Sequence, residues 1–409
     1  YEIGVRLVGS EMCIRDSDSI INVAINDPEC GYHAQMERYV MNDGWWGEGS
    51  PTYHYYPLRA MLLSADAVRC RNINLYDRKL YKMLVAPASG VYADLYFPAH
   101  NDGWYGESLI AQISLYEIAC QRYNNDPFFL SVLQQCYRYT DRNFGEALQN
   151  NIEIPQVTSM ETWPSVHFKE TGYTVLRSGT KTVVMKYGPH GGGHGHPDKL
   201  SISIHDGEKE IVSDMGTCAY GVPAFTKWYR KTLSHSTLTV DAKDQKESTG
   251  KLLAFKAYKD GGEVSAEAPD VYSGVTMERK LILKKNKLTD ILTARSDEQH
   301  LYDYVLILTE KPVFSQTGEV IILNDSPSYN YIKNAIVRKQ SSPLSCKIGK
   351  AYMKIEVSEG QEFEVITGEA PGIPPGNGSV LSKYDSPFCY PLILSLIHIS
   401  EPTRRTPIS

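Results

Sequence analysis

Two histidines separated by a single residue, His194 and His196, stand in a glycine-rich stretch that also holds an aspartate and a lysine. Side chains at positions i and i+2 of an extended backbone point to the same side, so the two imidazoles can serve one site. Asp214 and His235 follow on neighbouring β-like segments, and zinc accepts imidazole nitrogens and carboxylate oxygens as ligands. We therefore predict that His196, Asp214 and His235 bind a metal, with His194 free to face a cleft. The alternative is a turn with polar side chains and no ligand.

A second set of chemically able groups lies in an aromatic loop that begins at Asp43. Trp45 and Trp46 are predicted to stack on sugar rings, and the phenol of Tyr53 to donate or take a proton. Glu48 is assigned to the same substrate-binding loop. The two carboxylates have three roles open to them: bonding backbone amides that hold the loop, capping the next helix, or taking part in the chemistry.

The third cluster is the run Lys-Trp-Tyr-Arg-Lys at residues 227–231, shortly before His235. A guanidinium can grip a carboxylate or sulfate at two points, so Arg230 is predicted to bind an anionic group of a substrate. The equally open alternative is a solvated strand edge.

The elements that position these groups change character near residue 155. Between residues 18 and 154, apolar residues recur at intervals of three and four, which predicts helices. Between residues 155 and 393, short β-rich runs alternate with turns and no helical pattern intervenes. The predicted fold is therefore α+β with two domains, a helical array followed by an antiparallel β-sandwich.

Two loops of the helical part resemble each other, Asn-Asp-Gly-Trp-Trp-Gly-Glu at residues 42–48 and Asn-Asp-Gly-Trp-Tyr-Gly-Glu at residues 101–107. Each leads into a helical pattern. Repeated units of this kind are typical of helical hairpins in a toroid or solenoid, which present their loops on one rim.

The two ends of the chain are set apart from the fold. Residues 1–17 and the tail 394–409 resemble translated sequencing-adapter strings, and neither continues the pattern beside it. We expect them to be non-native, and the natural protein to extend further at its N-terminus.

Composition and charge exclude some functions. The formal net charge of −6 over 409 residues argues against non-specific nucleic-acid binding. No apolar run reaches the roughly 18 to 20 residues that span a bilayer. The chain holds 28 Tyr against 10 Phe, and a phenol, with its apolar ring and its hydroxyl group, suits a sugar-binding cleft.

Five pieces of the sequence, in order, carry a family resemblance. They are Glu-Gly-Ser-Pro-Thr-Tyr-His ending at residue 54, His-Gly-His-Pro-Asp-Lys-Leu-Ser from residue 194, Ser-Asp-Met-Gly-Thr at 213–217, Trp-Tyr-Arg at 228–230 and His-Ser-Thr-Leu-Thr-Val-Asp at 235–241. Together they resemble the heparinase II/III-like polysaccharide lyases, a group that includes alginate, oligoalginate and heparin-type lyases. The resemblance implies an α/α toroid, incomplete in this chain, an antiparallel β-sandwich and a cleft between them.

The resemblance also implies roles for residues. Tyr53 would transfer the catalytic proton, and His194 would face the substrate beside it. His54 ends the same motif and is assigned to substrate binding. Tyr220 and Tyr229 are candidate further contacts, in that order.

A structural zinc, held by the three predicted ligands, is likewise part of the resemblance. So is a periplasmic or secreted location. The family uses an Asn or His some fifty residues before the tyrosine, a position that falls at or before residue 1 here.

The implied reaction is β-elimination on a uronic-acid polysaccharide or oligosaccharide, an anionic substrate. One alternative is a glycoside hydrolase on an α/α toroid, with Asp43 and Asp102 or Glu48 and Glu107 as the carboxylate pair. Another is a non-catalytic carbohydrate-binding protein.

Overall fold

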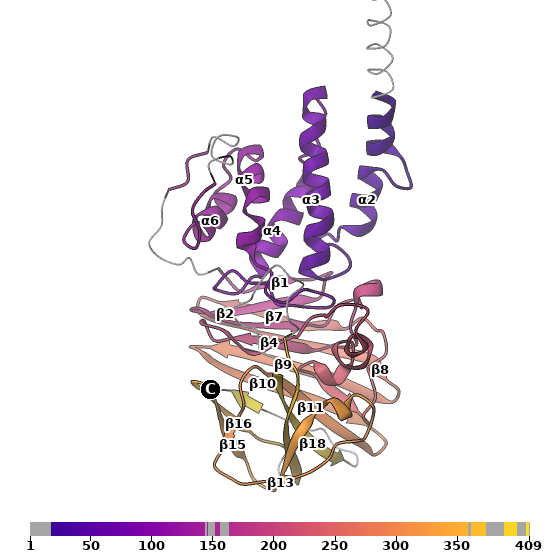
Figure 1. Ribbon diagram of the computed structural model, residues 1–409, viewed down its shortest axis with the longest axis vertical. Coiled ribbons are helices and arrows are strands. Elements are labelled where there is room, and N and C mark those ends of the chain that lie inside the picture. Colours follow the sequence, from indigo (N-terminus) through magenta and orange to yellow (C-terminus); the bar gives the residue numbers. More distant parts are fainter. Residues whose placement is uncertain are drawn as a thin grey trace, which may run out of the picture.

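The computed structural model describes residues 18–143, 145, 152–155, 163–358, 361–373, 388–398 and 406–408. The chain forms two parts, a group of helices that stands on one end of a large β-structure (Figure 1). Residues 1–17 lie outside the described part. The predicted order of helices followed by strands is confirmed.

The helical part comes first in the chain. Residues 18–26 are helical, and the longer helices that follow are α2 (Tyr32–Tyr39), α3 (Pro51–Ala67), α4 (Arg78–Gly90), α5 (Ile113–Arg122) and α6 (Pro127–Cys136). Proline at the first position begins α3 and α6, where the missing N–H has no intrahelical partner to lose. Asp77 caps α4 by accepting from the backbone N–H groups of Lys79 and Leu80. The toroid itself stays a prediction, because the described helices form only a short array.

The strands form two antiparallel sheets. The 11-stranded sheet runs β1-β2-β3-β4-β5-β11-β18-β17-β14-β13, with β6 beside β11. Its strands are β1 (Val166–Phe168), β2 (Tyr173–Ser178), β3 (Lys181–Lys186), β4 (Ser201–His205), β5 (Glu210–Val212), β6 (Leu238–Val240), β11 (His300–Leu308), β13 (Glu319–Val320), β14 (Lys333–Gln340), β17 (Phe363–Pro371) and β18 (Phe388–His398).

The 8-stranded sheet runs β12-β15-β16-β19-β10-β9-β8-β7. Its strands are β7 (Lys251–Tyr258), β8 (Gly261–Tyr272), β9 (Val275–Lys284), β10 (Lys287–Ser296), β12 (Val313–Phe314), β15 (Leu344–Ile348), β16 (Ala351–Ile355) and β19 (Thr406–Ile408). The predicted antiparallel sandwich is thus confirmed.

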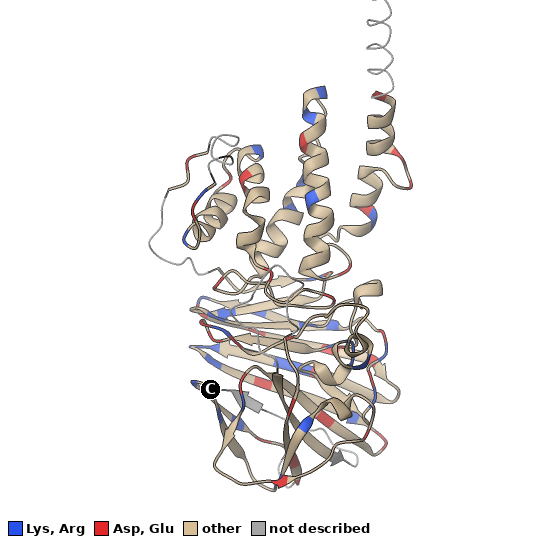
Figure 2. Ribbon diagram, viewed as in Figure 1, with Lys and Arg blue, Asp and Glu red and all other residues tan. Residues whose placement is uncertain are grey.

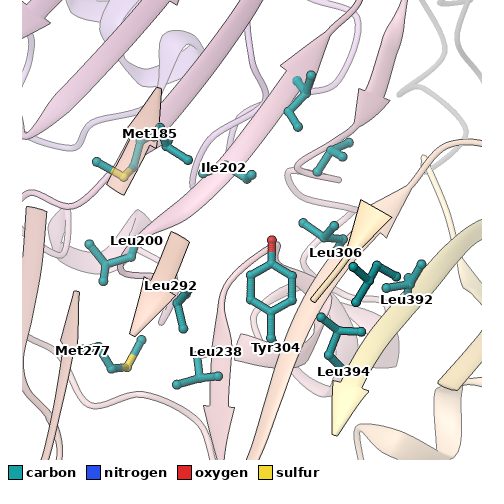
Figure 3. Packing of buried hydrophobic residues seen from close by; sticks show 14 of the residues in the cluster. Met185, Leu200, Ile202, Leu238, Met277, Leu292, Tyr304, Leu306, Leu392 and Leu394 are labelled. Atoms are coloured by element: carbon teal, nitrogen blue, oxygen red, sulfur yellow. The ribbon is translucent and has the colours of Figure 1, made fainter. Parts of the chain in front are cut away.

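An apolar core fills the space between the two sheets (Figure 3). Tyr304 carries its hydroxyl into this core, where it donates to Asp290 at 2.6 Å and accepts from Arg279 at 2.9 Å. Arg279 and Asp290 are fully buried and paired, so the charge of each is compensated. Because Arg279 on β9 and Asp290 on β10 belong to the 8-stranded sheet and Tyr304 on β11 belongs to the 11-stranded sheet, this triad ties the two sheets together.

Strand β18 passes the boundary that the sequence predicted at residue 394. It pairs with β11 through His398, and Leu394 and Leu396 are buried in the core. The structure therefore differs from the expectation that the whole tail lies outside the fold. The physical reason is that Leu394 and Leu396 continue the alternation of buried side chains along the strand, which extends its pairing with β11. The foreign origin of the two ends stays a prediction.

Charged residues of both signs are interspersed over the helices and the sandwich (Figure 2). Among the described residues, no helix is both long enough and apolar enough to cross a membrane.

Candidate active site between the helices and the sandwich

Three predicted residues meet where α3 reaches the sandwich. Tyr53 lies in the first turn of α3, and its ring stacks on His194 with centroids 3.6 Å apart and planes 18° apart. The hydroxyl of Tyr53 is hydrogen-bonded to the hydroxyl of Tyr220, which lies in the segment after β5 and is 49% exposed. Two phenols and an imidazole from three separate segments thus form one partly open group.

The two phenols are held in their neutral form. Burial raises the pKa of Tyr53, and the carboxylates of Asp102, Glu48 and Glu107 raise it further, while the bond to Tyr220 opposes the shift. Burial and the bond to Tyr53 also raise the pKa of Tyr220. At neutral pH both groups are therefore proton donors.

Asp102 orients the imidazole of His194. Its Oδ2 lies 3.0 Å from His194 Nδ1. Burial opposes ionisation of Asp102, but hydrogen bonds from His196 and His194 outweigh it and lower the pKa of this carboxyl. An ionised acceptor places the proton of His194 on Nδ1 and leaves a lone pair on Nε2. Glu48 Oε1 lies 4.0 Å from that Nε2 and would stabilise an imidazolium formed there.

The same carboxylate links His194 to the predicted metal ligands. The other oxygen of Asp102 lies 2.9 Å from His196 Nε2, so the lone pair of His196 is on Nδ1. That Nδ1 faces His235 Nε2 at 3.0 Å, and His235 Nδ1 is bonded to the carbonyl of Lys231 at 2.9 Å. Two nitrogen lone pairs at this distance repel each other unless a proton or a cation lies between them.

Two buried carboxylates complete the cluster. The ligand atoms of Asp198, Asp214 and His235 lie within 4.8 Å of one another. Asp214 Oδ2 accepts no hydrogen bond of normal geometry within the described residues, and His100 Nδ1 is 3.4 Å away. The structure thus brings Asp214 and His235 together as predicted and places His196 in contact with His235.

Asp198 is the ligand candidate that sequence reasoning missed. It follows His196 at i+2, the spacing that also separates His194 from His196, so the sequence held a signal for it. Lys186 Nζ lies 2.7 Å from its carboxylate. Burial raises the pKa of Asp198, but Lys186 and the neighbouring cations lower it below its ordinary value.

Trp45 and His54 were predicted to bind substrate, and the structure contradicts both. Trp45 is 3% exposed and packs edge-on against His54 and against the rings of Phe168 and Tyr173. His54 is fully buried: its Nδ1 accepts from the backbone of Trp46, and its Nε2 donates to a carbonyl of α4. Burial lowers the pKa of His54 to about 4. Trp45 joins the helical part to the sandwich, and His54 joins the aromatic loop to α4, so neither can touch a sugar.

Trp46 and Glu48 keep access to the solvent. Trp46 Nε1 donates to Glu48 Oε2 at 3.2 Å, and its ring stacks on Tyr39 at 5.1 Å. Their assignment to substrate binding stays a prediction.

Tyr229 is the other incorrect substrate contact. It is 5% exposed and donates its hydroxyl to the carbonyl of Gly372 at 2.7 Å, so it belongs to the sandwich core. The strand edge considered for this run is also wrong, because Phe225–Tyr229 form a single π-helical turn. Arg230 follows that turn, is partly exposed and donates to the carbonyl of Gly195 at 2.8 Å. It therefore lies against the loop that carries His194.

The carboxylate pairs considered for a hydrolase do not face each other as free acids. Asp43 accepts from the backbone N–H groups of Glu170 and Thr171, each at 2.8 Å. It thus bonds backbone amides, as one reading of the loop expected, but those of the β1–β2 turn. Asp102 is already shared by two imidazoles.

The second pair differs in environment. Glu48 is partly exposed, whereas Glu107 accepts from Thr52 Oγ1 at 2.8 Å inside the helical part. Burial raises the pKa of Glu107 to about 7.

Comparisons with known proteins agree with this architecture. Residues 160–304 match the family described as Heparinase II/III-like, C-terminal, so this segment carries a domain of that family and the predicted resemblance is confirmed. An alginate lyase of Stenotrophomonas maltophilia (strain K279a) is 26% identical over 322 residues, which cover 68% of this chain and 43% of the relative. An exo-oligoalginate lyase of Saccharophagus degradans is 23% identical over 350 residues, covering 74% and 47%.

A solved heparan sulfate lyase of Pedobacter heparinus has a TM-score of 0.68 at 16% identity and covers 92% of this chain and 54% of its own. At this identity the match shows the fold. The chain spans about half the length of the proteins it matches.

Proposed function

We propose that the protein is a polysaccharide lyase that cleaves a uronic-acid polysaccharide or oligosaccharide by β-elimination. The observation that carries the proposal is the stack of Tyr53 on His194, with Asp102 behind the imidazole. The names of the relatives, alginate and heparin-type lyases, support the substrate class.

The chemistry follows from which atoms can take or give a proton. His194 Nε2 holds a lone pair and takes the proton from C5 of the uronate, which leaves charge on C5 and its carboxylate. The electron pair then forms the C4–C5 double bond as the C4–O bond breaks. Tyr53, whose raised pKa keeps it protonated, gives its proton to the departing oxygen. Water does not take part.

The developing charge on the uronate needs donors aimed at it. Arg230 lies beside the His194 loop, where its Nη2 donates to the carbonyl of Gly195. Tyr220 offers a second donor next to Tyr53. We do not assign Tyr53 as a phenolate base, because three carboxylates near the phenol raise its pKa and so oppose its ionisation.

A zinc ion fits the buried cluster. Two imidazole lone pairs face each other, two carboxylates lie near, and Asp214 Oδ2 accepts no hydrogen bond of normal geometry from the part of the chain that the structure describes. His196, Asp214 and His235, joined by Asp198, would hold the ion. When bound, it would order the loop that carries His194 rather than activate water. A periplasmic or secreted location and the absence of a nucleic-acid partner belong to the same proposal.

The test is near-ultraviolet absorbance, because β-elimination creates an unsaturated uronate. Alginate, heparin and hyaluronan are supplied to this chain and to a form extended at its N-terminus. Absorbance should grow with one polymer, and the growth should be lost in Tyr53→Phe and His194→Ala.

Tyr56→Phe is the matched control, since Tyr56 lies on the same helix and is 82% exposed. New reducing ends without absorbance would contradict β-elimination and favour a hydrolase. Binding without any product would favour a carbohydrate-binding protein.

A further inference from the structure

A buried carboxylate outside the proposed catalytic group joins the helical part to the sandwich. Glu210 on β5 is 3% exposed and accepts hydrogen bonds from the hydroxyls of Tyr92 and Tyr105, and from Ser213 Oγ at 2.8 Å. We call Tyr92, Tyr105, Glu210 and Ser213 the Glu210 clamp. Two of its members belong to the sandwich and two to the helical part.

The two tyrosines flank the loop that carries Asp102. Tyr92 follows α4, and Tyr105 lies three residues after Asp102, so one carboxylate holds both ends of this loop. Within the loop, the backbone N–H of Asp102 donates to the carbonyl of His194 at 3.1 Å. Any shift of the loop therefore moves Asp102 relative to the imidazole that it orients.

The loop adopts a conformation that needs such support. Leu95 and Asn101 both have positive φ, 70° and 56°, and such a backbone is disfavoured for leucine above all. Strained residues of this kind persist only where the surroundings hold them. A second set of contacts acts near Tyr92, whose ring stacks on His205 at 4.8 Å, while His205 Nε2 lies 3.2 Å from Asp94.

We propose that Glu210 is a positioning residue of the elimination reaction: through Tyr92 and Tyr105 it fixes Asp102 against His194 Nδ1 and so sets the tautomer of the catalytic imidazole. The proposal rests on the proposed function. Among the described residues, no hydrogen bond or ion pair joins Glu210 to a predicted substrate group, so it acts through the loop that it holds.

The environment of Glu210 agrees with a role beyond packing. Burial raises the pKa of this carboxyl to about 7, although the hydrogen bonds from Tyr105, Tyr92 and Ser213 oppose the shift. A buried charge opposes folding, and an apolar or neutral side chain of similar size would not. A merely structural joint does not require an acid here.

The experiment removes one hydroxyl at a time. Tyr105→Phe keeps the ring and deletes one bond of the clamp, and Glu210→Gln keeps the size of the side chain and deletes its charge. Tyr116→Phe is the matched control, because the Tyr116 hydroxyl is buried and its bonds, to the carbonyl of Leu84 and to the hydroxyl of Tyr55 at 2.9 Å each, do not include Glu210 or Asp102. All three should still fold, as circular dichroism on heating can establish.

Two readouts decide the outcome. On the polymer that gives product, kcat should fall about tenfold or more in Tyr105→Phe and Glu210→Gln with KM unchanged, because misplacement of a catalytic group affects the chemical step. The control should keep its kcat even where its Tm falls. In substrate-free protein, the ¹⁵N imidazole signals of His194 should show Nδ1 protonated in the wild type and control, and a tautomer mixture in the two clamp variants.

An unchanged His194 tautomer together with an unchanged kcat would overturn the proposal, as would an equal loss of kcat in the control. If the wild type forms no unsaturated product, the proposed function fails, and the imidazole signals still decide whether the clamp sets the tautomer.

Discussion

The two Asn-Asp-Gly-Trp loops share a sequence pattern and hold different parts of the sandwich. In the first loop, residues 42–48, Asp43 accepts from backbone amides of the β1–β2 turn. In the second loop, residues 101–107, the equivalent Asp102 is bonded to the imidazoles of His194 and His196. One motif thus makes a structural joint in the first copy and part of the candidate active site in the second.

The difference arises from what each loop faces. A carboxylate at the same place in a turn accepts whatever donors lie opposite, and here these are main-chain N–H groups in one case and imidazoles in the other. The two loops also touch, because Asn101 Nδ2 donates to the carbonyl of Glu48 at 2.8 Å. In the first loop Gly44 has φ 98°, and a Cβ there would lie 2.3 Å from the carbonyl oxygen of Lys82, so only glycine fits.

The largest expected effect is a difference in kcat between variants of the two aspartates. Asp102→Asn should lower kcat by about 100-fold or more, because the amide no longer holds His194 in the Nδ1-protonated form. Asp43→Asn should keep kcat and lower the free energy of unfolding by about 2 kcal/mol, the loss expected for hydrogen bonds to a charged acceptor. Steady-state rates and urea unfolding measure both. Equal losses of kcat in the two variants would remove the distinction.

The second largest expected effect is a difference in zinc affinity between variants of the two loops. Asp102 is bonded to His196, so Asp102→Asn should weaken zinc binding by roughly 10 to 100-fold, as changes behind a metal ligand do. Asp43→Asn should bind zinc as the wild type does. Competition with a chromophoric chelator gives the affinities, and removal of the metal should lower the Tm of the wild type. Full stability after chelation would argue against a structural zinc.

The glutamates that end the loops should differ in the pH dependence of stability. The folded-state pKa of Glu107 is raised by burial from 4.5 to about 7, so its contribution is present below pH 4.5 and is lost as the pH rises through 7. Glu107→Gln should therefore gain up to about 3 kcal/mol relative to the wild type between pH 4 and pH 8. Glu48→Gln is the comparison variant, because that side chain is 37% exposed and is not enclosed as Glu107 is. Urea unfolding at both pH values is the measurement.

The smallest effect concerns the alkaline limb of the pH–rate profile. Burial and the nearby carboxylates raise the pKa of Tyr53, so the fall in rate that follows its deprotonation should lie above the ordinary range for tyrosine. Glu48→Gln removes one of these charges and should move the limb to lower pH. Activity that instead rises with pH through this limb would indicate that Tyr53 acts as the base.

Sequence reasoning located much of the site because its chemistry is carried by short, regular spacings. His196, Asp214 and His235 meet in one cluster although none of them lies in a strand, and Asp102 connects this cluster with His194, on which Tyr53 stacks. It failed for large aromatic residues. Trp45 and Tyr229 are the kind of side chain that binds sugars, but the same apolar area also packs well in a core, and type alone does not separate the two uses.

The sequence by itself determined the order of helices and strands, since periods of three to four and of two follow from backbone geometry. It also determined the donor atoms available for a metal and for proton transfer. Only the tertiary structure decided that Asp102 connects His194 with His196, that Glu210 holds the loop of Asp102, and that Trp45 and His54 are buried. Those outcomes depend on which segment lies opposite, and contacts across some 90 residues of chain leave no local pattern.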